Sequence, residues 1–185
     1  SAEDVDTVAI EGGGTIDGQG SAYWERKDTS KGPVWHGPPW RGTAQFEYRA
    51  LKRPHFLHLQ RCTNVVVRDV RLVNSPSWTL HLQRCVTATV DHVTIRNPLY
   101  GPNTDGIDLN SCIAVRVHHC DIVTGDDGVV LKSNEPGHDH PSRDIVVEDC
   151  RIWSACNAFK IGTETHDRFD DILFRNSHVY SDSPR

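Results

Sequence analysis

Two short acidic turns in the middle of the chain carry the residue types that acid–base chemistry needs. They are the segments NTDG (103–106) and GDDG (125–128), and a short apolar stretch follows each of them. When these stretches are aligned, Asp105 falls on Asp127, 22 residues later. If each stretch belongs to one coil of a parallel β-solenoid, the two side chains stack about 4.8 Å apart, the distance between neighbouring strands. With Asp126 beside them, three carboxylates then share one small patch.

Clustered carboxylates bind metals, transfer protons or cleave glycosidic bonds. Stacked like charges raise one another's pKa and oppose folding, so such a patch is expected where something uses it. The calcium spacing DxDxDG is missing, and we predict neither a metal nor another cofactor. Glycosidic cleavage needs one protonated acid and one ionised base, and repulsion within a cluster of three provides both. Asp105, Asp126 and Asp127 are therefore the candidate catalytic residues.

Composition excludes several classes of function. The net charge is −5 and no run of Lys or Arg is present, which argues against nucleic acid as a partner. No apolar stretch approaches the about 18 residues of a membrane span. The six cysteines include no CxxC pair, so a zinc ribbon is not expected. The chain has no Met and begins at Ser1, which we interpret as a mature form or an excised segment of a longer protein.

A sequence repeat dominates the chain from residue 55 onward. The hexapeptide LHLQRC at 57–62 recurs identically at 80–85, 23 residues later. Apolar and polar residues alternate in five further segments, at 64–75, 87–98, 114–125, 144–155 and 171–182. Strict alternation with many β-branched residues indicates strands, and the uneven repeat spacing assigns the insertions to turns.

Repeats of this length without a helical period predict an all-β fold, a single-stranded right-handed parallel β-helix of about six coils. We assign residues 1–185 to this one solenoid domain. Because nothing at 171–185 resembles a cap, we expect further coils to be missing at the C-terminal end. Two sets of cysteines recur at equivalent repeat positions, which favours inward stacks of free thiols over disulfides: Cys62, Cys85 and Cys112 in one, Cys120 and Cys150 in the other.

Residues 21–54 interrupt the pattern as a long Trp- and Pro-rich loop insertion. Its aromatic residues include Trp24, Trp35, Trp40 and Tyr48. They could cover the end of the core or form a wall on which sugar rings stack, and we favour the cover.

Extending the acidic alignment through all coils gives one column of residues, each at the start of a strand. The column comprises His55, Trp78, Asp105, Asp127 and Asn157. Its middle is acidic, with aromatic residues on one side and an amide on the other. This pattern predicts a groove along the solenoid axis that holds an extended polymer.

Several segments together form a specific signature. They are GTIDGQG (14–20), NSPSWTLH (74–81), the two acidic turns, and LKS (131–133). In these segments the chain resembles glycoside hydrolase family 28, the polygalacturonase family of right-handed parallel β-helices. The resemblance spans residues 14 to about 162, nearly the whole chain.

The resemblance implies a secreted or periplasmic hydrolase, acting as a monomer on α-linked galacturonic acid polymers such as pectin with inversion. By the family's pattern Asp126 is the general acid, and Asp105 and Asp127 activate the attacking water. Inversion fits an acid–base separation of about 6.5–9.5 Å, wider than the separation of a stacked pair.

The sequence departs from the family at the next turn. The family has Gly-His-Gly there, whereas this chain has Cys156-Asn157-Ala158, and the family's Arg-x-Lys segment does not occur before the chain ends. In the family, the Arg-x-Lys segment binds the substrate carboxylate. Lys160 either takes over this role or neutralises the negative charge of the acidic patch. The candidate substrate-binding residues are Trp78, Asn103, Lys132, Asn157 and Lys160.

Two other functions stay open at this stage. A calcium-dependent polysaccharide lyase or epimerase would use Lys132 or Lys160 to remove a proton next to the substrate carboxylate. A non-catalytic carbohydrate-binding β-helix would bind the polymer without cleaving it. Calcium dependence and an unsaturated product identify the first, and binding without cleavage identifies the second.

Overall fold

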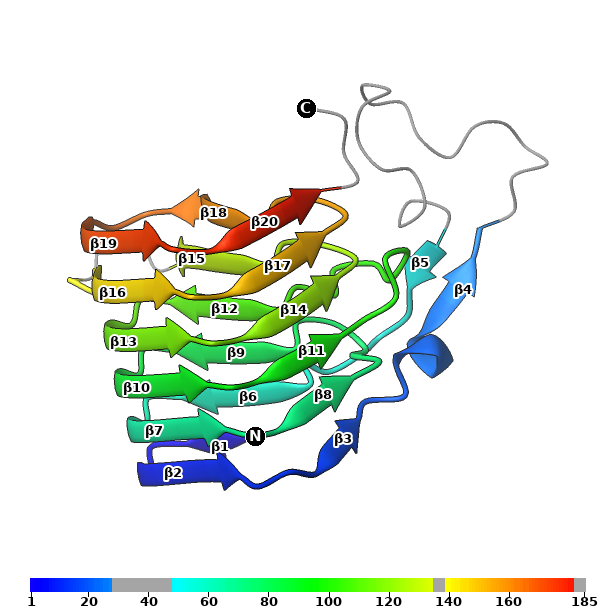
Figure 1. Ribbon diagram of the computed structural model, residues 1–185. Helices are drawn as coiled ribbons and strands as arrows, with labels where there is room; N and C mark the ends of the chain where they lie inside the picture. The colour runs from blue at the N-terminus through cyan, green and yellow to red at the C-terminus, as the bar shows by residue number, and fades with distance from the viewer. Residues whose placement is uncertain (28–47, 135–138, 182–185) are drawn as a thin grey trace.

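The computed structural model describes residues 1–27, 48–134 and 139–181. Within these ranges the chain winds through three parallel sheets of six strands each. Successive coils stack upward from the N-terminus in a right-handed sense (Figure 1). The predicted right-handed parallel β-helix and its six coils are confirmed.

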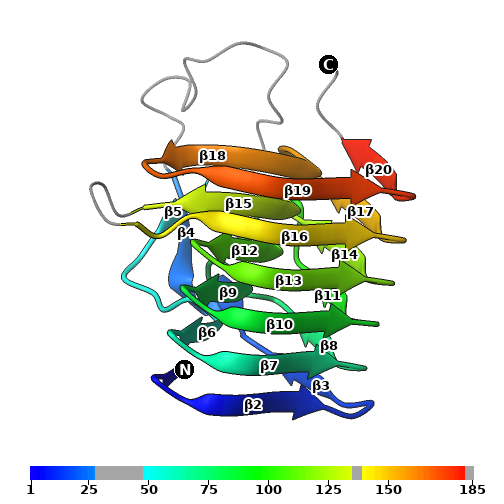
Figure 2. The ribbon, with the colours of Figure 1, turned by 90° about the vertical axis from the view of Figure 1, so that its left-hand side faces the viewer.

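Each coil contributes one strand to each sheet, and the chain runs from sheet A through sheet B to sheet C (Figure 2). Sheet A consists of β1 (Ala2–Glu3), β6 (Leu57–Gln60), β9 (Leu80–Gln83), β12 (Ile107–Asn110), β15 (Val129–Ser133) and β18 (Phe159–Thr165). Sheet B consists of β2 (Asp6–Glu11), β7 (Thr63–Arg68), β10 (Val86–Asp91), β13 (Ile113–His118), β16 (Ser142–Glu148) and β19 (Phe169–Arg175). Sheet C consists of β3 (Thr15–Asp17), β8 (Arg71–Val73), β11 (Thr94–Arg96), β14 (Asp121–Thr124), β17 (Arg151–Ser154) and β20 (His178–Ser181).

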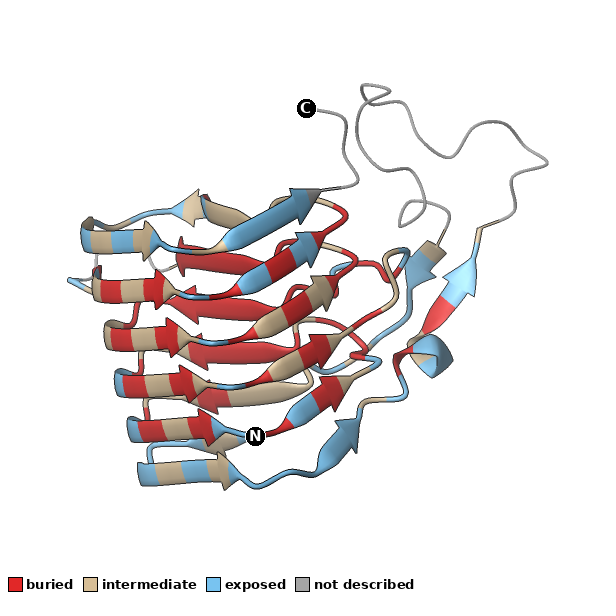
Figure 3. Cartoon of the chain, viewed as in Figure 1, coloured by how far each residue is buried: buried red, intermediate tan, exposed pale blue. Residues whose placement is uncertain are grey.

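The core lies between the three sheets and is built from columns of identical or similar apolar residues. One column along sheet B contains Val67, Val90, Val117, Val147 and Phe174, in the register that the repeat predicts. Its four valines are completely buried. Burying one such side chain stabilises the fold by about 1.5–3 kcal/mol. Buried positions concentrate in the middle coils, whereas β2, β3 and β20 at the two ends are more exposed (Figure 3).

Five of the six cysteines line this core. None of the six forms a disulfide, and all except Cys156 are buried. The thiol of Cys112 donates to the carbonyl of Leu82 in the coil below (3.3 Å), and that of Cys85 donates to the carbonyl of Leu59 (3.3 Å). The predicted thiol stacks are therefore present.

The described ends of the 21–54 segment attach to the side of the solenoid. A short 3₁₀ helix (Gly20–Tyr23) leads into β4 (Trp24–Arg26), which pairs antiparallel with β5 (Tyr48–Ala50). Trp24 Nε1 donates to the carbonyl of Pro76 at 2.9 Å, which anchors the ribbon.

Trp35 and Trp40 lie outside the described residues, so the choice between a cover and a sugar-stacking wall stays a prediction. Across the described ranges, no helix has the length and apolar character needed to cross a membrane.

Candidate active site

The turns that enter sheet A carry the predicted column. Strand pairing aligns Leu57, Leu80, Ile107, Val129 and Phe159, so the residues two positions before them also stack. These are His55, Trp78, Asp105, Asp127 and Asn157, as the repeat predicts. Backbone bonds join the turns directly: Gly106 N donates to Asp127 O (2.9 Å), and Gly128 N donates to Asn157 O (2.7 Å).

Asp105 lies in the middle of this column with only 3% of its surface exposed. Its Oδ1 atom is buried and has no hydrogen-bond partner. Burial, together with the charges of Asp108, Asp126 and Asp127, raises the pKa of Asp105 well above its ordinary value. The Asp105 carboxyl therefore favours its neutral form.

Asp126 is half-buried at the mouth of the turn. Its Oδ1 accepts the backbone N–H of Asp127 (3.0 Å), and its Oδ2 is 3.5 Å from the amide nitrogen of Asn103. Burial raises the pKa of Asp126, and the neighbouring Asp127 charge raises it further. A carboxyl of this kind can hold a proton at a pH where ordinary aspartates have lost theirs.

Asp127 is the ion-paired member of the cluster. Lys160 Nζ donates to its Oδ2 at 2.8 Å, and Asn157 Nδ2 donates to its Oδ1 at 2.6 Å. Burial alone lowers the pKa of Lys160, but the hydrogen bond and charge of Asp127 outweigh this and raise it. Lys160 is therefore a bound ammonium ion, and both donors support a negative charge on Asp127.

Aromatic residues continue the column below the carboxylates. The Trp78 ring lies 4.6 Å from His55 and is T-shaped to His81 at 4.9 Å. His81 is buried with neither ring nitrogen partnered, and burial lowers its pKa to about 2, so its ring is neutral. The ammonium of Lys132 lies 5.0 Å over the Trp78 ring, a cation–π contact that fixes the indole.

Lys132 is itself enclosed, with 4% of its surface exposed. Its ammonium donates to Glu164 Oε2 at 2.9 Å. Glu164 belongs to β18, and this ion pair holds the Lys132 ammonium beneath the residues of the cluster, away from solvent. Of the five predicted substrate-binding residues, Asn103 is the exposed one, while Asn157 and Lys160 both contact Asp127.

Sequence reasoning missed two residues, Asp108 and Arg53. Asp108 follows Asp105 by three residues and is fully buried, with neither carboxyl oxygen partnered. Burial raises the pKa of Asp108 well above its ordinary value, although the charge of Lys132 opposes this. Alternation along the strand that follows the NTDG turn places Asp108 on the outer face of sheet A, which was the available signal.

Arg53 approaches the acidic cluster from the segment that precedes β6. Its guanidinium donates to Asn103 Oδ1 and to the carbonyl of Pro102, each at 2.7 Å. Burial lowers the pKa of Arg53, against the opposing charges of Asp105 and Asp126. Arg53 stands two residues before His55, so extending the column's alternation by one step would have identified it.

The burial of Asp108 has a measurable effect on stability. Because its folded pKa is raised, the native state keeps a proton that the unfolded chain releases above its ordinary pKa of 3.8. This contribution is complete at low pH and declines as the pH rises toward the folded pKa. An Asp108→Asn variant cannot ionise, so its unfolding free energy should fall less steeply as the pH rises. The slopes of the wild type and the variant should differ by up to about 1.4 kcal/mol per pH unit.

Urea unfolding of both proteins between pH 4.5 and 8 would measure this difference. Asp69→Asn, at an exposed turn position, is the matched control and should leave the slope unchanged. Parallel profiles for wild type and Asp108→Asn would show that Asp108 is ionised in the folded protein.

Comparison with protein families shows which family contains a chain of this kind. Residues 1–139 match the family described as glycosyl hydrolases family 28. The chain belongs to this family. The match covers the three aspartates of the cluster and ends before Asn157 and Lys160, the two residues that depart from the pattern expected for glycoside hydrolase family 28.

Relatives of similar sequence are named as polygalacturonases or probable polygalacturonases. A probable polygalacturonase of Vitis vinifera is 31% identical over 172 residues, 90% of this family 28 chain and 32% of that protein. An endo-polygalacturonase of Pectobacterium parmentieri is 30% identical over 158 residues, 84% of this chain and 37% of that protein. The family 28 chain thus spans about a third of the length of these relatives.

Solved structures agree with the fold. The hyperthermoactive exopolygalacturonase of Thermotoga maritima superposes with a TM-score of 0.62 and 35% identity, covering 68% of this chain and 29% of that one. The polygalacturonase of Erwinia carotovora ssp. carotovora superposes with a TM-score of 0.67 at 24% identity, covering 97% of this chain and 47% of that one. The second likeness concerns the fold alone.

Proposed function

We propose that the protein hydrolyses α-linked galacturonic acid polysaccharide, such as pectin, with inversion of configuration. The observation that carries this proposal is the cluster of Asp105, Asp126 and Asp127 on adjacent coils of a family 28 solenoid. It supplies a carboxyl that retains its proton beside one that is paired with a cation, the combination that glycoside hydrolysis requires. The polygalacturonase relatives support the same substrate class.

In this mechanism Asp126 protonates the oxygen of the leaving sugar. It is half-buried, its pKa is raised by burial and by the Asp127 charge, and the exposed Asn103 lies beside it. Asn103 is suited to position the sugar at the acid, and Arg53 holds the Asn103 amide in place.

The attacking water is activated by Asp105 and Asp127 acting together. Burial keeps Asp105 neutral, whereas Lys160 and Asn157 hold a charge on Asp127, so the pair carries one negative charge. The charged member accepts the water's proton, and the neutral one can donate a hydrogen bond to the same water.

Lys132 and Trp78 lie beside the carboxylate cluster, and Lys132 orients the Trp78 ring. The cation–π contact fixes the Trp78 ring, which is partly exposed and can stack on a sugar. We propose that Lys132 orients the indole instead of binding the substrate carboxylate itself. The protein is proposed to act outside the cytoplasm and as a monomer.

The lyase and epimerase alternative is not favoured by the lysine environments. A lysine that removes a carbon-bound proton must be neutral at working pH, which requires a lowered pKa. Lys132 is instead ion-paired with Glu164, and the pKa of Lys160 is raised. Release of an unsaturated, ultraviolet-absorbing product in a calcium-dependent reaction would restore this alternative.

The product anomer tests the proposal directly. Proton NMR during digestion of oligogalacturonate should show the inverted anomer first, before mutarotation mixes the two. First appearance of the retained anomer would contradict inversion. Binding of the polymer with no new reducing ends, in a chain whose folding is verified by circular dichroism, would favour the non-catalytic β-helix.

Replacing Lys160 separates its two interpretations. In Lys160→Met the Asp127 carboxylate loses the ammonium group that lies 2.8 Å from its Oδ2 atom. We expect kcat to fall about 10- to 100-fold, the effect of removing a hydrogen bond to a charged group. Steady-state kinetics of wild type and variant measures kcat and KM.

Lys160→Arg is the matched control and should recover part of the activity, because it keeps the charge. A rise in KM alone, with kcat unchanged, would assign Lys160 to the substrate carboxylate instead.

A further inference from the structure

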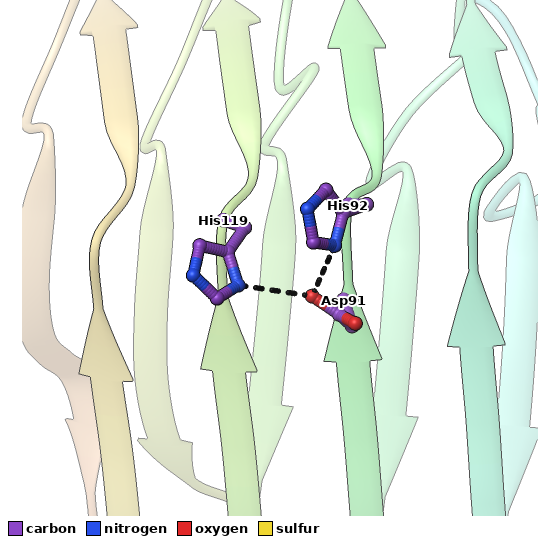
Figure 4. Close-up of side chains that lie close together, drawn as sticks. All are labelled: Asp91, His92 and His119. Carbon is purple, nitrogen blue, oxygen red and sulfur yellow. Dashed lines mark hydrogen bonds and ion pairs between the residues drawn. The ribbon is translucent and has the colours of Figure 1, made fainter.

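A second cluster of polar side chains lies at the turns between sheets B and C, away from the turns that enter sheet A. It consists of Asp91, His92, His118 and His119, from two adjacent coils. The rings of His92 and His119 lean toward the Asp91 carboxylate from neighbouring turns (Figure 4). We propose that these four residues form a site for a divalent transition metal ion such as Zn²⁺.

The ligand atoms already converge on one point. Asp91 Oδ1 lies 2.6 Å from His92 Nδ1, 3.0 Å from His118 Nδ1 and 3.2 Å from His119 Nδ1. Tetrahedral zinc with bonds of about 2.0–2.1 Å places its ligands about 3.3 Å from one another. To enclose the ion, Asp91 Oδ1 would need to move away from the three nitrogens by about 0.1 to 0.7 Å, most of all from His92 Nδ1.

Hydrogen bonds alone do not give each of these ring nitrogens a partner of its own. His118 Nδ1 and His119 Nδ1 are only 2.9 Å apart, so one must accept while the other donates, and both also face Asp91 Oδ1. A cation at the centre would give all three nitrogens and the carboxylate a partner at once. Imidazole and carboxylate are together a favoured ligand set for Zn²⁺.

The fold alone does not account for the histidines. The last residues of the sheet B strands form a stacked column, Glu11, Arg68, Asp91, His118, Glu148 and Arg175. Charges alternate along this charge ladder, with Arg68 bound to Glu11 and Arg175 bound to Glu148. The alternation of acidic and basic residues explains why a basic residue occupies position 118. It does not explain why position 119 is also a histidine.

That next residue occupies the left-handed region of backbone space in every coil. The position is filled by Gly12, Asp69, His92, His119, Asp149 and Asn176, all with positive φ. Gly, Asn, Asp and His are residues that this conformation commonly selects. The turn therefore permits a histidine in each coil, but it does not require two in adjacent coils that both contact one carboxylate.

Charge and access also suit a metal. In the described part of the chain, the hydrogen bonds and ion pairs of the Asp91 side chain all come from these histidines. His92 and His119 are 57% and 50% exposed, so an ion can enter from solvent.

A second group with ligand geometry, Asp126, Asp127 and Cys156, lies in the catalytic cluster. Burial and the two carboxylates raise the pKa of the Cys156 thiol to about 12, which opposes the thiolate that a metal needs. The histidine cluster is therefore the better site, and metal binding there joins two coils.

Calorimetric titration of the metal-stripped, tag-free chain with zinc chloride tests the proposal. We expect one Zn²⁺ per chain, a dissociation constant below about 10 µM at pH 7.5, and a melting temperature raised by about 5–10 °C at a hundredfold excess over the dissociation constant. Co²⁺ in place of Zn²⁺ should give the visible absorption of a tetrahedral site.

His92→Asn and His119→Asn are the decisive variants, because Asn is found at the same turn position in another coil and keeps the backbone conformation. Each should weaken zinc binding at least about tenfold while leaving the melting temperature of the metal-free chain unchanged. The exposed His178→Ala is the control and should bind as wild type does.

Two results would overturn the proposal. One is the absence of a zinc-dependent heat or thermal shift in the wild-type chain. The other is unchanged affinity in both asparagine variants together with loss of binding in Cys156→Ser, which would place the ion in the catalytic cluster.

Discussion

Asp126→Asn is expected to lower kcat on polygalacturonate by about 10²–10⁴-fold, the contribution of a positioned general acid. Asparagine keeps the shape of the side chain, and its carbonyl oxygen can still accept the backbone N–H of Asp127. It cannot protonate the leaving oxygen. Release of reducing ends by wild type and variant at equal concentration measures the effect.

The fold should survive this change. Asp126 has a raised folded pKa, so its stabilising contribution declines as the pH increases, and a neutral asparagine avoids that loss. The variant should therefore melt at or above the wild-type temperature at pH 7. Asp149→Asn, at an exposed turn, is the control and should retain full activity.

The pH profile gives an independent check. Activity should decline with increasing pH as Asp126 loses its proton, and because its pKa is raised, this alkaline limb should lie above the range of ordinary aspartates. An Asp126→Asn variant that retains wild-type kcat would remove Asp126 from the mechanism. Asp105 would then become the candidate acid.

Gly106→Ala is expected to disrupt both stability and activity. A Cβ at Gly106 would lie 2.4 Å from the carbonyl oxygen of Gly128 and 2.8 Å from a methyl group of Ile122. The oxygen belongs to the backbone of the next coil, so relief requires the two coils to separate. Overpacking of this kind costs about 1–3 kcal/mol or more.

The same separation would move Asp105 away from Asp127, because Gly106 N donates to Asp127 O at 2.9 Å. An error of about 1 Å in a catalytic geometry can cost about 100-fold in rate. Chemical denaturation and polygalacturonate hydrolysis measure the two effects separately. Gly13→Ala is the matched control, since a Cβ there meets nothing within 4 Å.

Wild-type stability in Gly106→Ala would show that the two coils can separate at this point without lowering the free energy of unfolding. Wild-type activity in a destabilised Gly106→Ala would instead show that the Asp105–Asp127 spacing is not critical. The first result would contradict the close-packing explanation of the glycine, and the second would contradict the link between coil spacing and activity.

The repeat allowed most of the fold to be predicted. Because the LHLQRC hexapeptide recurs identically and the strands alternate strictly, stacking Asp105 on Asp127 needed only the alignment of neighbouring coils. The same register placed His55, Trp78 and Asn157 correctly. Periodicity determines register in a solenoid, and register determines which side chains become neighbours.

Other parts of the site depend on interactions that periodicity does not encode. Asp108 is one polar residue in an alternating strand, and only three-dimensional burial distinguishes it from a solvated one. The two interpretations of Lys160 differ by the direction of one flexible side chain, which the repeat does not set; in the structure its ammonium lies 2.8 Å from Asp127 Oδ2. Arg53 lies before the first repeat, so only its spacing of two residues from His55 connects it with the column, and its contact with Asn103 is not encoded in the repeat.

The charge ladder on sheet B restricts how a solenoid of this kind can change in length. The sheet A strands cannot distinguish the coil at 57–62 from the coil at 80–85, because their hexapeptides are identical. Removing the coil that carries Arg68 would stack Glu11 on Asp91, and directly opposed like charges destabilise a sheet. Removing two consecutive coils would restore the alternation. On this face the number of coils is therefore subject to a parity rule, under which gains and losses are tolerated in pairs.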